Sequence, residues 1–193
     1  MNISKFNPKF TNITLMALWP LIIFSFIIIS FAISLKNNPQ EIPSQMIDQP
    51  FPDFALPDLL DMDVTIDHSY FDGQVTLVNI FGSWCVACDQ EHPMLMWLAE
   101  NNEIKMLGVD WRDTVEKGRR WLELRGNPYS RVVFDADSML AIDLGVTGAP
   151  ESFIVDKNGQ IRYKFIGPIT PKTWQDELKP FVLALQAETG GAE

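Results

Sequence analysis

The chain contains two cysteines, Cys85 and Cys88, separated by two residues. They follow the apolar, β-branched run 75–81, which is typical of a strand buried on both faces, and they begin a helix-compatible segment. At a helix start this spacing keeps both sulfurs within disulfide distance, so the pair can cycle between dithiol and disulfide. The free N–H groups of the first turn favour the Cys85 thiolate, while Cys88 lies under that turn. The pattern predicts thiol–disulfide exchange with Cys85 as nucleophile and Cys88 as resolving thiol.

Two other uses of the cysteine pair stay open at this point. A structural disulfide that encloses two residues would constrain little chain entropy. A metal site through Cys85, Cys88 and His92 would supply three ligands where a closed zinc site needs four. We therefore expect neither a metal nor a cofactor, and we place His92 on the helix surface without a chemical role.

Alternating strand and helix patterns position this motif. Strands are predicted over 75–81, 104–109, 131–134, 152–155 and 161–166, with shorter extended segments in 51–60 and 64–66. Helices are predicted over 88–99, 115–125, 138–144 and 174–187. Alternation implies parallel pairing, and the Asp156-Lys157-Asn158-Gly159 turn adds an antiparallel hairpin. The expected fold class is α/β, with a mixed central sheet flanked by helices.

An uncharged segment precedes this domain. Ile13 to Leu35 holds 23 residues without a charge, enough for a helix to cross a membrane. Lys5 and Lys9 come before it, which places the N-terminus in the cytoplasm and the remainder on the other side. A cleaved signal peptide is the alternative. The predicted organisation is a cytoplasmic end 1–12, a transmembrane signal anchor 13–35, a Pro-rich tether 36–50, a domain 51–187 and a flexible tail 188–193.

The charge of the chain excludes one class of partner. All 25 acidic residues and 12 of the 15 basic residues follow residue 36, so the body of the protein is strongly acidic. Nucleic-acid phosphates require positive charge, and we expect no nucleic-acid binding.

Several motifs in order resemble one group of thioredoxin-fold proteins. Val78–Cys88 resembles a thioredoxin-like active site, and Gly145–Phe153 resembles the cis-proline loop of one subgroup. Gly108–Trp111 and Arg162–Thr170 are similar to the same subgroup. That subgroup comprises the membrane-anchored thiol:disulfide interchange proteins of cytochrome c maturation, the CcmG/DsbE type, and the similarity covers roughly residues 50–187.

The resemblance implies a thioredoxin-like fold and a reductant in the periplasm, held in the inner membrane. Electrons would come from a membrane thiol transporter of the DsbD/CcdA type. They would pass to the CxxCH disulfide of apocytochrome c, directly or through a partner thiol protein, before haem attachment. A general periplasmic thioredoxin-like reductase with another client is the alternative, and a non-enzymatic metallochaperone or apocytochrome holdase is a third possibility.

The resemblance also implies roles for residues around the cysteines. Trp84 would shape the docking surface, and the Ala149–Pro150 bond would be cis, facing the cysteines. Asn79 stands where thioredoxins usually carry a buried Asp, so proton transfer must involve other groups. Glu91 and Glu151 are expected to form one acidic centre near the thiols that tunes the potential and relays protons to Cys88.

Overall fold

The computed structural model describes residues 9–34, 46–71 and 73–188, in two units, Met1–Ile42 and Pro43–Glu193. The first unit contains helix α1 (Lys9–Ser34). Within the described parts of the chain, no helix combines the length and apolar character that crossing a membrane requires. The anchor expected at 13–35 stays a prediction. The end of the chain after Glu188, where most of the predicted tail falls, lies outside the described residues.

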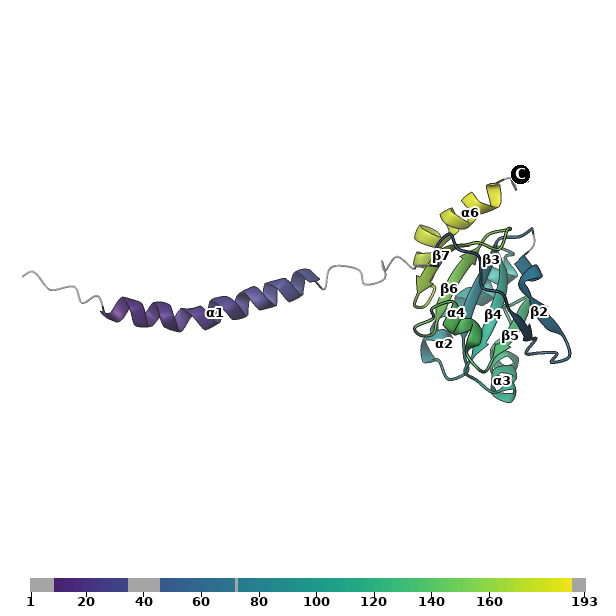
Figure 1. The fold of residues 1–193 in the computed structure, drawn as a ribbon, viewed down its shortest axis with the longest axis horizontal. Helices are drawn as coiled ribbons and strands as arrows, with labels where there is room; N and C mark the ends of the chain where they lie inside the picture. The colour runs from purple at the N-terminus through teal and green to yellow at the C-terminus, as the bar shows by residue number, and fades with distance from the viewer. Residues whose placement is uncertain (1–8, 35–45, 72, 189–193) are drawn as a thin grey trace, which may run out of the picture. The chain divides into compact units, whose positions relative to one another are not determined.

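A mixed five-stranded sheet forms the centre of the second unit, in the order β5-β4-β3-β6-β7 (Figure 1). Its strands are β3 (Thr76–Phe81), β4 (Lys105–Trp111), β5 (Arg131–Asp135), β6 (Glu151–Val155) and β7 (Ile161–Ile166). The first three run parallel because helices connect them, and β6 lies antiparallel to both β3 and β7. The prediction of a mixed sheet is confirmed.

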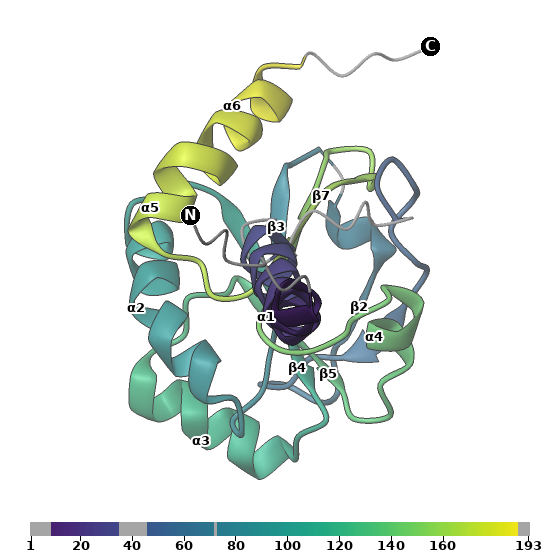
Figure 2. The same ribbon diagram turned by 90° about the vertical axis from the view of Figure 1, so that its left-hand side faces the viewer.

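Helices cover both sides of this sheet, as Figure 2 shows. On one side lie α2 (Val86–Glu100), α3 (Val115–Arg125) and the C-terminal helical run, and on the other lies the short α4 (Met139–Asp143). The C-terminal run consists of α5 (Pro171–Thr173), the π-helical turn η2 (Trp174–Leu178) and α6 (Lys179–Ala187). Pro180 has no N–H to donate to the preceding turn, which accounts for the π-helical turn before it.

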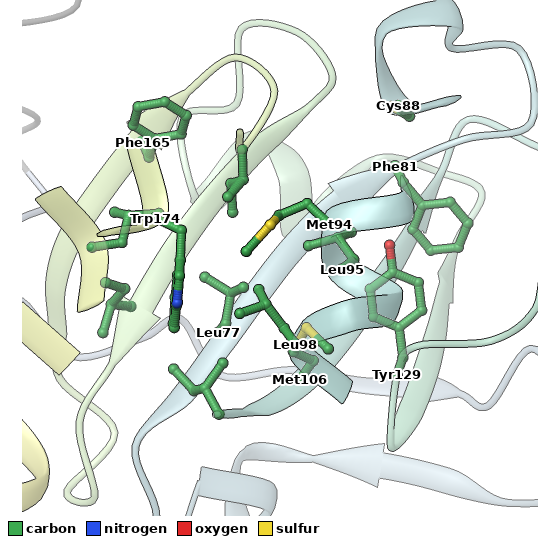
Figure 3. Close-up of a cluster of buried hydrophobic side chains, with 14 of the residues drawn as sticks. Leu77, Phe81, Cys88, Met94, Leu95, Leu98, Met106, Tyr129, Phe165 and Trp174 are labelled. Carbon is green, nitrogen blue, oxygen red and sulfur yellow. The ribbon is translucent and has the colours of Figure 1, made fainter. Parts of the chain in front are cut away.

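The alternation of side chains along β3 separates two cores. Leu77 and Phe81 point to the side covered by α2, which we call the cysteine face, and pack with Leu98 and Trp174 (Figure 3). Val78 and Ile80 point to the other side, the opposite face, in a core with Phe71, Leu140 and Phe153. Because the six residues of β3 are all buried, both faces of this strand are dry and each polar side chain on it needs a partner inside the protein.

The segment before β3 packs on the sheet. Strands β1 (Ala55–Pro57) and β2 (Thr65–Asp67) form a two-stranded antiparallel sheet, and the 3₁₀ helix η1 (His68–Phe71) follows. The Asp48 N–H donates to the Ile161 carbonyl at 2.7 Å, and Arg162 Nε contacts Asp48 Oδ1 at 3.0 Å. The described end of the predicted tether, residues 46–50, is therefore part of the folded unit, because its backbone pairs with the start of β7.

Candidate active site

The two cysteines lie at the N-terminus of α2 and form a disulfide with an S–S distance of 2.08 Å. Cys85 is the N-cap residue, and its Sγ accepts the Cys88 N–H at 3.1 Å. Cys85 is 5% exposed, whereas Cys88 is 1% exposed. A first-turn N–H group at one sulfur stabilises the thiolate form of Cys85 after reduction. The difference in access makes Cys85 the sulfur that an external disulfide can reach first.

The loop before the cysteines holds an exposed indole. Trp84 is 49% exposed, and its Nε1–H donates to the Trp111 carbonyl at 3.0 Å. Gly82 permits this arrangement, since a Cβ there would lie 2.5 Å from Trp84 Nε1. The backbone N–H of Ser83 donates to Asp113 Oδ2 at 2.6 Å. Trp84 therefore precedes Cys85 in a loop that is held by both β4 and the segment after it.

The Ala149–Pro150 peptide bond is cis, as expected from the sequence. Glu151 pairs with Ile80 across β6 and β3, which brings Pro150 level with the end of β3. The chain leaves β3 at this same end to reach Cys85. The proline loop and the cysteine loop thus lie at the same end of the central strands, where an extended segment of a client could lie.

A buried polar network lies on the cysteine face. Asn79 Nδ2 donates to Glu91 Oε1 at 2.9 Å and to Ser152 Oγ at 3.0 Å, and Tyr129 OH donates to Asn79 Oδ1 at 2.7 Å. The Ile169 N–H donates to Glu91 Oε2 at 2.9 Å. All the polar atoms of the Asn79 and Glu91 side chains thereby take part in hydrogen bonds within the protein. Asn79 connects these groups by hydrogen bonds but does not transfer protons between them, because an amide does not titrate.

Glu91 is the group of this network that titrates near neutral pH. It follows Cys88 by three residues, which is the next turn on the same side of α2, and it is 1% exposed. Burial raises the pKa of Glu91 to about 7, and the hydrogen bonds from Ile169 and Asn79 oppose this increase. Burial likewise raises the pKa of Tyr129 well above its usual value, so its hydroxyl stays protonated. A carboxyl that gains and loses a proton near neutrality therefore lies one turn beyond the buried cysteine.

Glu151 does not join Glu91 in the acidic centre that the sequence suggested. Successive residues of a strand point to opposite faces, and Ser152 is the β6 residue that reaches Asn79. Glu151 points to the opposite face, where its Oε1 accepts the N–H groups of Thr147 and Gly148 at 2.8 and 3.1 Å. Its Oε2 lies 3.0 Å from Lys164 Nζ. Glu151 therefore braces the loop before Pro150.

The expectation for His92 is wrong, because this side chain is buried rather than on the helix surface. Its ring packs edge-on against Trp121 of α3, and its Nε2 lies 3.2 and 3.1 Å from the carbonyls of Arg125 and Gly126. These carbonyls end α3, so His92 satisfies a helix C-terminus. Within the described part of the chain, no group of three or more His, Cys, Asp and Glu residues is placed to hold a metal ion.

The sequence indicated no individual role for three polar residues of the cysteine face, Tyr129, Ser152 and Asp110. Tyr129 and Ser152 are partners of Asn79, and an isolated amide in a buried strand is a signal that such partners exist. Asp110 is fully buried near the end of β4, and burial, followed by the nearby charge of Asp113, raises its pKa to about 8. The sequence feature that indicates such a residue is a single acid in the largely apolar run 104–111.

Comparisons with known proteins agree with this chemistry. The profile of the family described as Redoxin matches residues 46–179. The thiol:disulfide interchange protein DsbE of Allochromatium vinosum is 42% identical over 170 residues, covering 88% of this chain and 94% of the relative. DsbE of Escherichia coli K12 is 37% identical over 167 residues, covering 83% and 90%.

The fold has similar solved structures as well. A secreted thiol-disulfide isomerase of Corynebacterium glutamicum superposes with a TM-score of 0.60 at 26% identity, covering 68% of this chain and 84% of that one. Together with the strand order and the helix that begins at the cysteines, this similarity identifies the fold as thioredoxin-like.

Proposed function

We propose that this chain, which belongs to the redoxin family as a thiol:disulfide interchange protein of the DsbE type, is a periplasmic reductant for cytochrome c biogenesis. Thiol:disulfide oxidoreductase activity follows from the family and from the cysteine pair. The client is the proposal: the CxxCH disulfide of apocytochrome c, reduced directly or through a partner thiol protein. The motifs that surround the cysteines and the proline loop support this client.

Reduction of the client takes two exchange steps. The Cys85 thiolate attacks one client sulfur, a mixed disulfide forms, and the other client sulfur leaves as a thiolate. Cys88 then loses its proton and attacks the Cys85 sulfur, which releases the second client sulfur. The client gains two electrons and two protons, and the protein is left with the Cys85–Cys88 disulfide. A membrane thiol transporter of the DsbD/CcdA type would restore the dithiol.

Glu91 is the residue suited to take the Cys88 proton. Its place one turn beyond Cys88 and its pKa of about 7 support this role, because a base works best when its pKa is near the working pH. Asn79 orients the Glu91 carboxyl through the 2.9 Å hydrogen bond. Trp84 and Pro150 would form the surface on which the client segment lies.

One observation carries the direction of electron flow: Glu91, buried on the cysteine face one turn beyond Cys88, is an acid with a pKa of about 7 and becomes negatively charged near neutral pH. Negative charge near a cysteine opposes its thiolate, and a less stable thiolate favours the disulfide form of the protein. A protein that prefers its disulfide form gives electrons to its partner. This arrangement is suited to reduction of clients rather than to their oxidation.

The uncharged stretch Ile13–Leu35 supports the location of this activity. We assign it as a signal anchor in the inner membrane, with residues 1–12 in the cytoplasm and the domain from residue 51 in the periplasm. Lys5 and Lys9 set this orientation by the positive-inside rule. An anchored reductant lies close to a membrane thiol transporter and to clients emerging from the membrane.

Trapping of mixed disulfides tests the client. In cells that make c-type cytochromes, the full-length Cys88→Ser variant lacks the resolving thiol and retains its partner on Cys85. We expect capture of apocytochrome c or of a thiol protein of its maturation, and no capture by the matched Cys85→Ser variant. Capture confined to unrelated secreted proteins would overturn the cytochrome proposal in favour of a general periplasmic reductase.

A further inference from the structure

Asp110 is a buried carboxyl that the exchange steps above do not use. It lies on the cysteine face, since β4 alternates in step with β3 and Asp110 pairs with Phe81. It is 0% exposed, and among the described residues no N–H or O–H group donates to its carboxyl oxygens, whereas a side-chain hydrogen bond with Asp113 favours its protonated form. A carboxylate left in that state is costly, because nothing replaces the water it has lost.

Helix α3 closes over this carboxyl. A Cβ on Gly118 would lie 2.1 Å from Asp110 Oδ2 and 3.1 Å from Leu59 Cδ2, so only glycine fits at this point of the helix. Glycine in a helix interior costs roughly 0.5–1 kcal/mol relative to alanine. Backbone of α3 and the aliphatic side chain of Leu59 thus cover Asp110 on this side.

Asp113 connects this buried carboxyl to the active-site loop. Its Oδ2 accepts the Ser83 N–H at 2.6 Å, and its Oδ1 accepts the Thr114 N–H at 2.8 Å. Ser83 is two residues before Cys85, and Thr114 is the N-cap of α3. An ionised Asp113 strengthens both hydrogen bonds, because charged acceptors bind N–H groups more tightly than neutral ones.

We propose that Asp110 is a positioning residue of the redox site: it keeps its proton in the folded protein so that ionised Asp113 can hold the loop before Cys85. Loss of the Asp110 proton places a second negative charge beside Asp113. Repulsion between the two carboxylates then weakens the contact between Asp113 and Ser83, and the loop that carries Trp84 and Cys85 loosens. The inference concerns the thiol:disulfide activity itself and is independent of which client is reduced.

The groups around Asp110 agree with this assignment. Burial is the main cause of its raised pKa of about 8, and the charge of Asp113 and a side-chain hydrogen bond with Asp113 add to it. Tyr129 is a second titratable neighbour: it stacks on Phe81 at 5.0 Å, and Glu91 and Asp110 raise its pKa further (Figure 3). Leu59 and Gly118 bring no titratable side chain. At neutral pH the Asp110 carboxyl is therefore protonated, and the Tyr129 hydroxyl stays neutral throughout.

The test separates Asp110 from Glu91 by working in the Glu91→Gln background. Infrared difference spectra follow the C=O band of protonated carboxyl groups. Reduction of the disulfide by tris(hydroxypropyl)phosphine is timed over the same pH range and divided by the rate for a small-molecule disulfide, which cancels the titration of the phosphine. We expect a protonated-carboxyl band that disappears as the pH rises through about 8, with a change of at least about twofold in the reduction rate over that interval. Adding Asp110→Asn should abolish both titrations.

Asp113→Asn provides a second, independent variant, because it removes the neighbouring charge and leaves Asp110 in place. The titration should then move to lower pH by about 1 unit. Asp137→Asn, an exposed acid at the same edge of the sheet, is the matched control and should leave the profile unchanged. A band that persists with Asp110→Asn, a titration that Asp113→Asn does not move, or a rate profile that neither variant alters would overturn the assignment.

Discussion

Buried acids have different partners on the two faces of the central sheet. On the opposite face, Glu151 meets Lys164 and two loop N–H groups, and Asp135 accepts the N–H groups of Leu140 and Ala141 at 3.3 and 2.9 Å. On the cysteine face, Glu91 accepts hydrogen bonds from uncharged groups, and the polar partner of Asp110 is a second acid, Asp113. These acids are buried to a similar extent on both faces. The groups that contact each acid therefore determine whether it fixes a loop or retains a proton.

Removing the cation on the opposite face should have the largest effect on stability. Lys164→Met leaves Glu151 buried without its positive partner, and we expect a loss of about 3–5 kcal/mol in the free energy of unfolding. Urea denaturation measures it. Lys172→Met, which breaks an exposed pair with Asp176, is the control and should cost about 0–1 kcal/mol. A loss below about 1 kcal/mol for Lys164→Met would mean that the loop N–H groups hold Glu151 without help.

Glu91→Gln tests the cysteine face through pH. The pKa of Glu91 rises from 4.5 to about 7 on folding, so between these values the folded state binds more protons than the unfolded state. Stability therefore falls as the pH rises from about 4.5 to 7, by about 3 kcal/mol from this group. Glu91→Gln should remove that part of the fall, as urea denaturation at several pH values would measure.

The control for Glu91 lies on the same helix. Glu100 is exposed at the end of α2, and Glu100→Gln should leave the pH dependence of stability unchanged. Equal slopes for the wild-type protein and Glu91→Gln would contradict the proton-holding role of the cysteine face.

Tyr129→Phe should have a smaller effect on the same face. It deletes the hydroxyl that donates to Asn79 Oδ1 at 2.7 Å and leaves that buried oxygen without this donor. We expect a loss of about 1–2 kcal/mol in the free energy of unfolding, with the disulfide still formed. An unchanged free energy of unfolding would mean that Asn79 Oδ1 does not need the Tyr129 donor. The partners of buried polar groups would then matter less on the cysteine face than proposed.

Trp84→Phe should have the smallest effect on stability, because the indole is half-exposed and makes one hydrogen bond to the Trp111 carbonyl. We expect a loss of about 0.5–1 kcal/mol in thermal or urea unfolding. A loss of several kcal/mol would place Trp84 in the core of the fold rather than on its docking surface.

The sequence predicted the features that depend on local pattern. The spacing of Cys85 and Cys88, the apolar run before them and the helix after them determine the disulfide at the start of α2. Helix α3 runs over the predicted residues 115–125, because Thr114 caps its start and Gly126, with a φ of 91°, ends it.

The sequence could not predict features that depend on strand register or on distant partners. The residues of β6 are all buried, so no alternation of polar and apolar residues indicated which face Glu151 would take. His92 was misplaced because the carbonyls that it contacts end a helix 33 and 34 residues later in the chain. Tyr129 lies 50 residues from its partner Asn79, and nothing in the local pattern joins them.

The reduction potential of the Cys85–Cys88 couple, measured against glutathione and dithiothreitol from pH 5.5 to 8.5, tests most directly whether buried acids make this site an electron donor. We expect a value at pH 7 well below the roughly −120 mV of the oxidant DsbA. We also expect a change of slope near pH 7 that Glu91→Gln removes. A potential at or above about −120 mV, with a pH dependence that Glu91→Gln leaves unaltered, would contradict both expectations.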